Sequence, residues 1–120
     1  TASLTYISMG KSIDILKEIK CDLIFILGDR YETFAMASAA YLLGIPIAHL
    51  HGGESSYGSL DDKLRHAITQ LSTWHFTSSE KYKKKVILLS SPVGDQLAVH
   101  DSFYNSDVLR HVTLSFFLLL

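Results

Sequence analysis

Three short groups of charged and imidazole side chains in the middle third of this chain have the residue types of an enzyme site. They are Gly28-Asp29-Arg30, the segment 49–54 (HLHGGE) and the segment 61–66 (DDKLRH). In the first group, a carboxylate such as Asp29 can take or return a proton, and the planar guanidinium of Arg30 can hold a phosphate. That pairing suits an anionic sugar or a nucleotide. The structural alternative is that Asp29 caps the following helix and Arg30 makes a surface ion pair.

The second group contains two histidines and a carboxylate. His49 and His51 lie two residues apart at a strand end, and we expect them to have separate roles and to share no metal ion. One of them is expected to be a hydrogen-bonded core histidine, whereas the other, His51, should project toward a ligand. A catalytic or binding role suits His51, because the charge of a histidine can change near neutral pH. Glu54 follows the Gly52-Gly53 pair and competes with His51 for the same role.

The third group opens a helix, where the helix dipole favours acids such as Asp61 and Asp62. Arg65 lies four residues after Asp61, and His66 lies four residues after Asp62. Each acid can therefore pair along the helix, which contributes about 0.2–0.5 kcal/mol per pair. Such a small contribution to stability does not by itself explain so many charged residues in the segment 61–66.

The spacing of apolar residues predicts helices and strands in alternation. We expect helices over 7–19, 31–43 and 60–71 and a basic helix over 80–87, the third opened by a capping box at 59–62. We expect strands at 22–27, 45–50 and 74–77, the first covered on both faces. This order predicts an α/β fold with a doubly wound, Rossmann-like parallel sheet. Ligands bind beyond the carboxyl ends of such strands, so the loops at 28–30 and 49–54 should share one site.

Composition narrows the functional classes. With 120 residues, 48% of them apolar, residues 1–120 should form one domain around one core. A net charge of −1 gives no field that would favour nucleic acid or a membrane surface, and the run Lys81–Lys85 is interpreted as a solvated helix face. The lone Cys21 excludes an internal disulfide and suits the cytoplasm. Since no apolar stretch reaches the roughly 20 residues of a membrane span, and phosphate-loop, dinucleotide and esterase motifs are missing, we expect no membrane partner, no nucleic-acid partner and no cofactor.

Four ordered motifs together resemble a known family. They are 27–32 (LGDRYE), 45–54 (IPIAHLHGGE), 61–69 (DDKLRHAIT) and 74–76 (WHF). The chain is similar to the UDP-N-acetylglucosamine 2-epimerases, particularly the hydrolysing branch that makes N-acetylmannosamine for sialic acid synthesis. The resemblance covers about 8–88 and leaves 89–120 as an unassigned tail.

The resemblance implies an incomplete domain. Family members look like two facing Rossmann-like domains of the GT-B type with substrate in the cleft between them, and this chain matches the later part of the first domain. Together with a start at Thr1 rather than methionine, this makes the chain an expected fragment or processed product with little turnover on its own. The resemblance also implies a homo-oligomer for the full-length protein.

The resemblance implies a reaction and roles. UDP leaves UDP-N-acetylglucosamine to give a glycal-like intermediate, and water then adds so that free N-acetylmannosamine is released. In the family, carboxylates act as acid and base in this reaction. Some relatives carry glutamate where His51 stands, so here either His51 or Glu54 performs the proton transfer of that position. The candidate catalytic residues are Asp29, His51 and Asp61. The candidate substrate-binding residues are Arg30, Glu54, Asp62 and Arg65.

Two alternatives stay open. One is a non-catalytic truncated module that associates with itself or a partner through apolar surface, including Phe116 to Leu120. The other is a non-hydrolysing epimerase, which returns UDP-N-acetylmannosamine. The Gly-Asp-Arg and His-Gly-Gly-Glu motifs favour the hydrolysing type.

Overall fold

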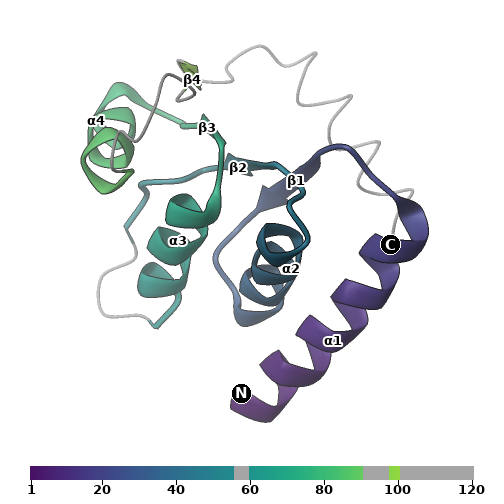
Figure 1. The fold of residues 1–120 in the computed structure, drawn as a ribbon. Coiled ribbons are helices and arrows are strands. Elements are labelled where there is room, and N and C mark those ends of the chain that lie inside the picture. Colours follow the sequence, from purple (N-terminus) through teal and green to yellow (C-terminus); the bar gives the residue numbers. More distant parts are fainter. Residues whose placement is uncertain (56–59, 91–97, 101–120) are drawn as a thin grey trace.

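A computed structural model describes residues 1–55, 60–90 and 98–100, and in them helices and strands alternate as predicted (Figure 1). In chain order the elements are α1 (Ala2–Ile19), β1 (Ile24–Leu27), α2 (Tyr31–Leu42), β2 (Ile47–Leu50), α3 (Leu60–Leu71), β3 (Trp74–Phe76), α4 (Glu80–Leu89) and β4 (Ala98–His100). All neighbouring strands are parallel, in the order β1-β2-β3-β4. The prediction of a parallel, Rossmann-like α/β sheet is confirmed.

The helices α1, α2 and α3 form one layer on one side of the sheet (Figure 1). Right-handed crossovers between strands that follow one another in sequence place their helices on the same face. Within the described residues the strand order never reverses, so the reversal that defines a doubly wound sheet is not seen in this part of the chain. Helix α1 packs on α2, and α2 packs on α3.

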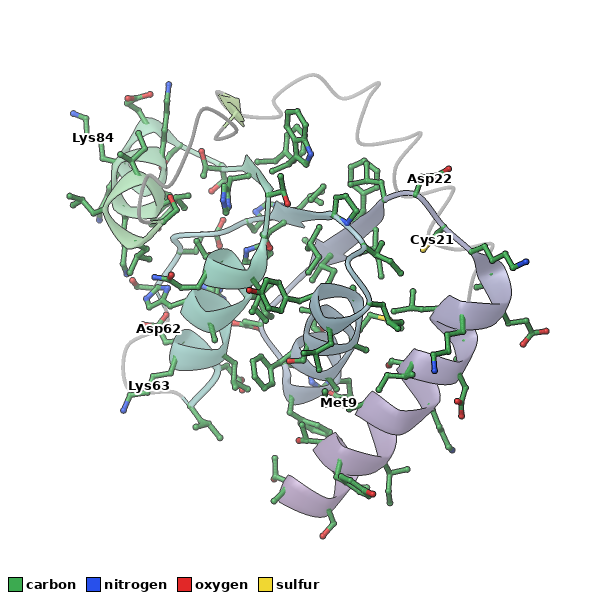
Figure 2. The ribbon with its side chains drawn as sticks, in the orientation of Figure 1. Met9, Cys21, Asp22, Asp62, Lys63 and Lys84 are labelled. Carbon is green, nitrogen blue, oxygen red and sulfur yellow. The ribbon has the colours of Figure 1, made fainter. Side chains whose placement is uncertain are left out.

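The core lies between this helix layer and the sheet. Its buried residues include Leu16 of α1, Ile26 of β1, Ile47 of β2 and Ile68 of α3. Helix α2 contributes buried alanines to the same cluster, and these small side chains let its backbone approach both the sheet and α1. Met9 of α1 packs against this core from its edge (Figure 2).

Several element boundaries differ from the sequence prediction, and the starts of α1 and β2 show why. Helix α1 begins at Ala2 rather than at residue 7. Periodicity did not predict its first turns, because Leu4 and Tyr6 there are 53% and 81% exposed and form no buried apolar stripe. Strand β2 begins at Ile47 rather than at residue 45, because the Ile45 N–H bonds the Ala40 carbonyl and ends α2 instead.

Strand β1 is not covered on both faces by described residues, so that expectation was wrong for this part of the chain. Ile24 and Ile26 face the helix layer, whereas Leu27 is 54% exposed. On the face opposite the helices, the rings of Phe25 and Phe76 lie 6.4 Å apart between centroids. An unbroken apolar run is typical of a strand covered on both faces, and among the described residues it leaves Phe25 and Leu27 on the face away from the helix layer.

Other expectations fall on residues outside the described ranges. These are Ser59 of the predicted capping box and the apolar segment Phe116 to Leu120. Among the helices that the structure describes, none combines the length and apolar character needed to cross a membrane.

Candidate active site

The candidate site is built on the carboxyl ends of three adjacent strands. Asp29 lies in the loop after β1, His51 to Ser55 follow β2, and Ser78 follows β3. Gly28 has φ +102°, a conformation that a residue with a Cβ adopts only with strain. This turn after β1 leads directly to Asp29.

The carboxylate of Asp29 accepts a hydrogen bond from Nη2 of Arg65 in α3 and forms an ion pair with it. The side chains are only 19% and 11% exposed, so solvent screens the pair far less than a surface pair. The pair therefore ties α3 to the loop after β1. Asp29 does not cap α2, because Arg30 occupies the N-cap position there and α2 has no side-chain cap.

The pairing predicted along α3 is half right. Asp62 lies four residues before His66 with its Oδ2 3.8 Å from His66 Nε2, as expected. Arg65 does not pair with Asp61, because its guanidinium pairs with the partly buried Asp29 carboxylate instead. Asp61 is partly buried in the first turn of α3, and no cation in the described part of the chain lies within ion-pair distance of it.

The second carboxylate of the site is Glu54, and it is held from two sides. His51 Nδ1 lies 2.8 Å from Glu54 Oε1, and the Ser78 hydroxyl donates to the same oxygen at 2.6 Å. Partial burial by itself would raise the pKa of Glu54, but the hydrogen bonds from Ser78 and His51 and the positive charges of His51 and Arg65 outweigh it and lower that pKa. Glu54 is therefore ionised at neutral pH.

His49 is the core histidine that the sequence analysis expected. It is fully buried, with Nε2 3.4 Å from the Gly28 carbonyl and Nδ1 3.2 Å from the Thr69 hydroxyl. Because a carbonyl only accepts, we assign the ring proton to Nε2. The single proton of the Thr69 hydroxyl is then shared between His49 Nδ1 and the Arg65 carbonyl, which lies 3.1 Å from that hydroxyl. Burial lowers the pKa of His49 to about 4, so the ring is neutral at pH 7 and links β2 to the loop after β1 and to α3.

Gly52 and Gly53 serve close packing within the chain. A Cβ on Gly53, which has φ +80°, would lie 2.6 Å from the Tyr82 carbonyl oxygen of α4. A Cβ on Gly52 would lie 3.2 Å from His49 Nδ1. The pair therefore lets the loop after β2 pass directly over α4 and His49.

Arg30 behaves as the structural alternative predicted. Its side chain is 71% exposed and forms an ion pair with Glu32 at 3.3 Å. Of the lysine run, Lys84 points away from the molecule into solvent (Figure 2), whereas Lys85 donates to the Ser55 hydroxyl of the loop after β2. The solvated-face interpretation thus holds for Lys84 and not for Lys85.

Sequence reasoning missed Ser78, Thr69 and His75. Ser78 could have been found, because it directly follows a predicted strand and must lie at the same sheet edge as the other loops. Thr69 and His75 carry no such signal, since each looks like an ordinary position of a helix or a strand. His75 is fully buried, and burial lowers its pKa to about 4.

A family model described as UDP-N-acetylglucosamine 2-epimerase matches residues 1–94, beyond the segment 8–88 on which the resemblance rests. The Escherichia coli "Polysialic acid biosynthesis protein P7" is 41% identical over 100 residues, which cover 78% of this chain and 26% of that protein. The Campylobacter jejuni "GDP/UDP-N,N'-diacetylbacillosamine 2-epimerase (hydrolyzing)" is 46% identical over 76 residues, covering 63% of this chain and 20% of that protein. The chain thus spans about a quarter of the length of the curated relatives it matches.

Solved structures give the same result for the fold. UDP-GlcNAc 2-epimerase from Neisseria meningitidis bound to UDP-GlcNAc superposes with a TM-score of 0.71 and 29% identity, over 80% of this chain and 27% of that one. UDP-N-acetylglucosamine 2-epimerase from Rickettsia bellii gives a TM-score of 0.75 and 22% identity, over 95% of this chain and 31% of that one. These likenesses confirm the expected fold class, part of one half of a GT-B fold.

Proposed function

The chain belongs to the UDP-N-acetylglucosamine 2-epimerase family, and from that premise we propose that it forms part of the active site of a hydrolysing nucleotide-sugar 2-epimerase. The proposed substrate is UDP-N-acetylglucosamine, and the products are UDP and N-acetylmannosamine. One observation carries the proposal. The partly buried Asp29–Arg65 ion pair lies at the carboxyl edge of a parallel sheet, where ligands of such folds bind.

The proposed reaction needs groups that move protons and groups that hold the substrate. We assign proton transfer to Asp29, His51 and Asp61, as UDP leaves the sugar and water later adds. Arg65 keeps the Asp29 carboxylate in place, and a partly buried carboxylate at a fixed position is an effective acid or base. The remaining assigned contacts to substrate come from Arg30, Glu54, Asp62 and Arg65.

The hydrolysing reaction is favoured by the relatives. Two of them carry "(hydrolyzing)" in their names and are 46% and 40% identical to this chain. The same names support a second candidate substrate, UDP-N,N′-diacetylbacillosamine, which differs from the first in its sugar and shares its uridine diphosphate. The non-hydrolysing reaction stays as an alternative that a product assay distinguishes.

We propose that this chain alone turns over little substrate, because it spans about a quarter of its relatives' length. The rest of the site would come from protein outside the chain, and the full-length protein would be a homo-oligomer. A cytoplasmic location fits a nucleotide-sugar substrate and a lone cysteine, Cys21.

The test is calorimetric titration of the chain with UDP-N-acetylglucosamine, UDP-N,N′-diacetylbacillosamine and UDP. We expect saturable binding of one nucleotide sugar that Asp29→Asn reduces at least tenfold. The matched control is Asp22→Asn, because Asp22 is an exposed aspartate at the amino end of β1, away from the proposed site (Figure 2). If a chain with native circular dichroism binds none of the three ligands, the proposal that this part of the chain holds substrate fails.

Two further measurements separate the alternatives. The product of any turnover, read by mass spectrometry, is free N-acetylmannosamine for the hydrolysing reaction and UDP-N-acetylmannosamine for the other. Turnover at the rate of a complete family member would contradict the proposed inactivity of the chain alone. Association of the chain in light scattering, lost when residues 112–120 are deleted and accompanied by no ligand binding, would favour the non-catalytic module.

A further inference from the structure

His51 lies at the point where β2 ends, in a backbone conformation that is uncommon for its residue type. Its φ is +62°, and it is one of only two non-glycine residues with positive φ among those described. Its N–H bonds the Phe76 carbonyl of β3 at 2.8 Å, so the turn is anchored to the neighbouring strand. Positive φ in a residue with a side chain is retained where the surroundings enforce it, and such positions cluster at functional sites.

The side chain of His51 is oriented by an acceptor that cannot donate. Its Nδ1 lies 2.8 Å from Glu54 Oε1, and an ionised carboxylate only accepts hydrogen bonds. Nδ1 must therefore carry the proton. A neutral imidazole has one N–H, so Nε2 holds the free lone pair and can act as a base.

Glu54 is itself fixed by Ser78. The Ser78 hydroxyl donates at 2.6 Å to the same Oε1 atom that accepts from His51. Ser78 lies two residues after Phe76, the residue whose carbonyl anchors the His51 backbone. The end of β3 thus holds both the backbone of His51 and the carboxylate that orients its ring.

We propose that Glu54 and Ser78 are positioning residues that set the Nδ1–H tautomer of His51 and so make Nε2 the proton-transferring atom of this sheet edge. This inference rests on the proposed function, and it resolves the choice between His51 and Glu54. His51 carries the proton, and Glu54 does not exchange it. When Nε2 takes a proton from the substrate, the imidazolium that forms is balanced by the Glu54 carboxylate already bonded to Nδ1–H.

The His51–Glu54 pair also belongs to the same charge set as the Asp29–Arg65 pair. The positive charge of Arg65 contributes to lowering the pKa of Glu54, so the two pairs lie close enough to interact. The side chain of His51 is 46% exposed, against 19% for Asp29. Nε2 has no hydrogen-bond partner among the described residues, so it is available to a ligand.

The test is the tautomer of His51, read from two-bond nitrogen–proton correlations in the histidine-labelled chain at pH 8. Free imidazole in water favours the Nε2–H tautomer, so we expect His51 to show the opposite form. A His51 ring in the Nε2–H form in the unmodified chain would overturn the inference without any variant.

Three variants then isolate the positioning role. Ser78→Ala should shift the tautomer population of His51 toward Nε2–H, whereas Ser78→Thr, which keeps the hydroxyl, should restore it. Ser72→Ala is the matched control, because Ser72 also donates its hydroxyl, to the Ile68 carbonyl at 2.6 Å, but belongs to the turn after α3. An unchanged His51 tautomer in Ser78→Ala would overturn the role of Ser78, and if that variant does not fold, Glu54→Ala gives the same readout.

Failure here and failure of the proposed function are distinguishable. The tautomer is measured without substrate, and the titrations of the proposed function do not depend on it. An Nδ1–H tautomer with no nucleotide-sugar binding would leave the local geometry correct and refute the function. Binding with an Nε2–H tautomer would support the function and refute this inference.

Discussion

Replacement of the buried His75 by leucine tests the electrostatics of the core directly. His75 is fully buried, and neither ring nitrogen has a hydrogen-bond partner in the described part of the chain. A buried polar group without a partner costs about 1–3 kcal/mol, and leucine has a similar volume with no polar atom. A shape mismatch of this kind costs up to about 1.5 kcal/mol. We therefore expect the free energy of unfolding of His75→Leu at pH 7.5 to lie between about 0.5 kcal/mol below and about 3 kcal/mol above that of the unmodified chain.

The same substitution should remove part of the sensitivity to acid. Burial lowers the pKa of His75 to about 4, below the unfolded value of about 6.5. The folded chain therefore resists protonation, so stability is fully present above pH 6.5 and is lost as the pH falls toward 4. At pH 5 this loss amounts to about 2 kcal/mol for His75, and it is absent in His75→Leu.

His49→Leu is the matched comparison, because burial also lowers the pKa of His49 to about 4. This variant should lose the same acid sensitivity. It should also cost about 1–3 kcal/mol at pH 7.5, because the Gly28 carbonyl loses its donor and the Thr69 hydroxyl keeps only the Arg65 carbonyl as a partner.

The assay is urea unfolding followed by circular dichroism at pH 7.5 and pH 5.0. Other ionisable groups, including His66, are present in all three proteins and cancel in the comparison. An equal loss of stability between the two pH values in His75→Leu and the unmodified chain would refute the reasoning from burial. A loss above about 2 kcal/mol at pH 7.5 in His75→Leu would show that the ring has a partner.

Two further predictions concern the loops of the candidate site. Asp29→Asn should lower the free energy of unfolding by about 2–4 kcal/mol, because it leaves the 11% exposed Arg65 side chain unpaired. In urea unfolding, adding Arg65→Met should recover part of that loss. Strict additivity of the two substitutions would exclude a coupled pair. Gly53→Ala should cost about 1–3 kcal/mol more than Gly28→Ala, because its Cβ would lie 2.6 Å from the Tyr82 carbonyl oxygen, whereas a Cβ on Gly28 meets nothing nearer than 3.9 Å. Both glycines have positive φ, so backbone strain is common to the two variants, and similar melting temperatures for them would argue against the close approach of the loop to α4.

Local signals predicted the elements well where a residue acts through its own backbone. Gly44, with φ +71°, and Pro46 mark the end of α2 within one residue of the predicted boundary. The Ser79 side chain accepts from the Tyr82 N–H and begins α4 as expected. Such features depend on the backbone preference of one residue or on a hydrogen bond between near neighbours, so a short stretch of sequence is enough to predict them.

Partners distant in sequence could not be predicted in the same way. Asp61 lies four residues before Arg65 on the same helix, so the spacing predicted that these two would pair. Periodicity cannot show that Arg65 instead pairs with Asp29, which lies 36 residues away in the sequence. Strand alternation would place His49 and His51, which are two residues apart, on the same face, so our expectation of separate roles for them did not follow from it. It could not show that His51 leaves the strand at φ +62°, where the backbone rather than the alternation sets its direction.

The partners of the carboxylates indicate which of them is left to respond to substrate. Asp29 is neutralised by Arg65, and Glu54 accepts from both His51 and Ser78. Asp61 has no cation within ion-pair distance in the described part of the chain, although the start of α3 favours its negative charge. On the proposed function, the first two carboxylates are held before substrate arrives, because the groups that donate hydrogen bonds to them come from neighbouring loops and helices. Asp61 is then the carboxylate whose contacts substrate binding can change most, so we expect Asp61→Asn to leave stability nearly unchanged and to weaken nucleotide-sugar binding in the titration that tests Asp29→Asn.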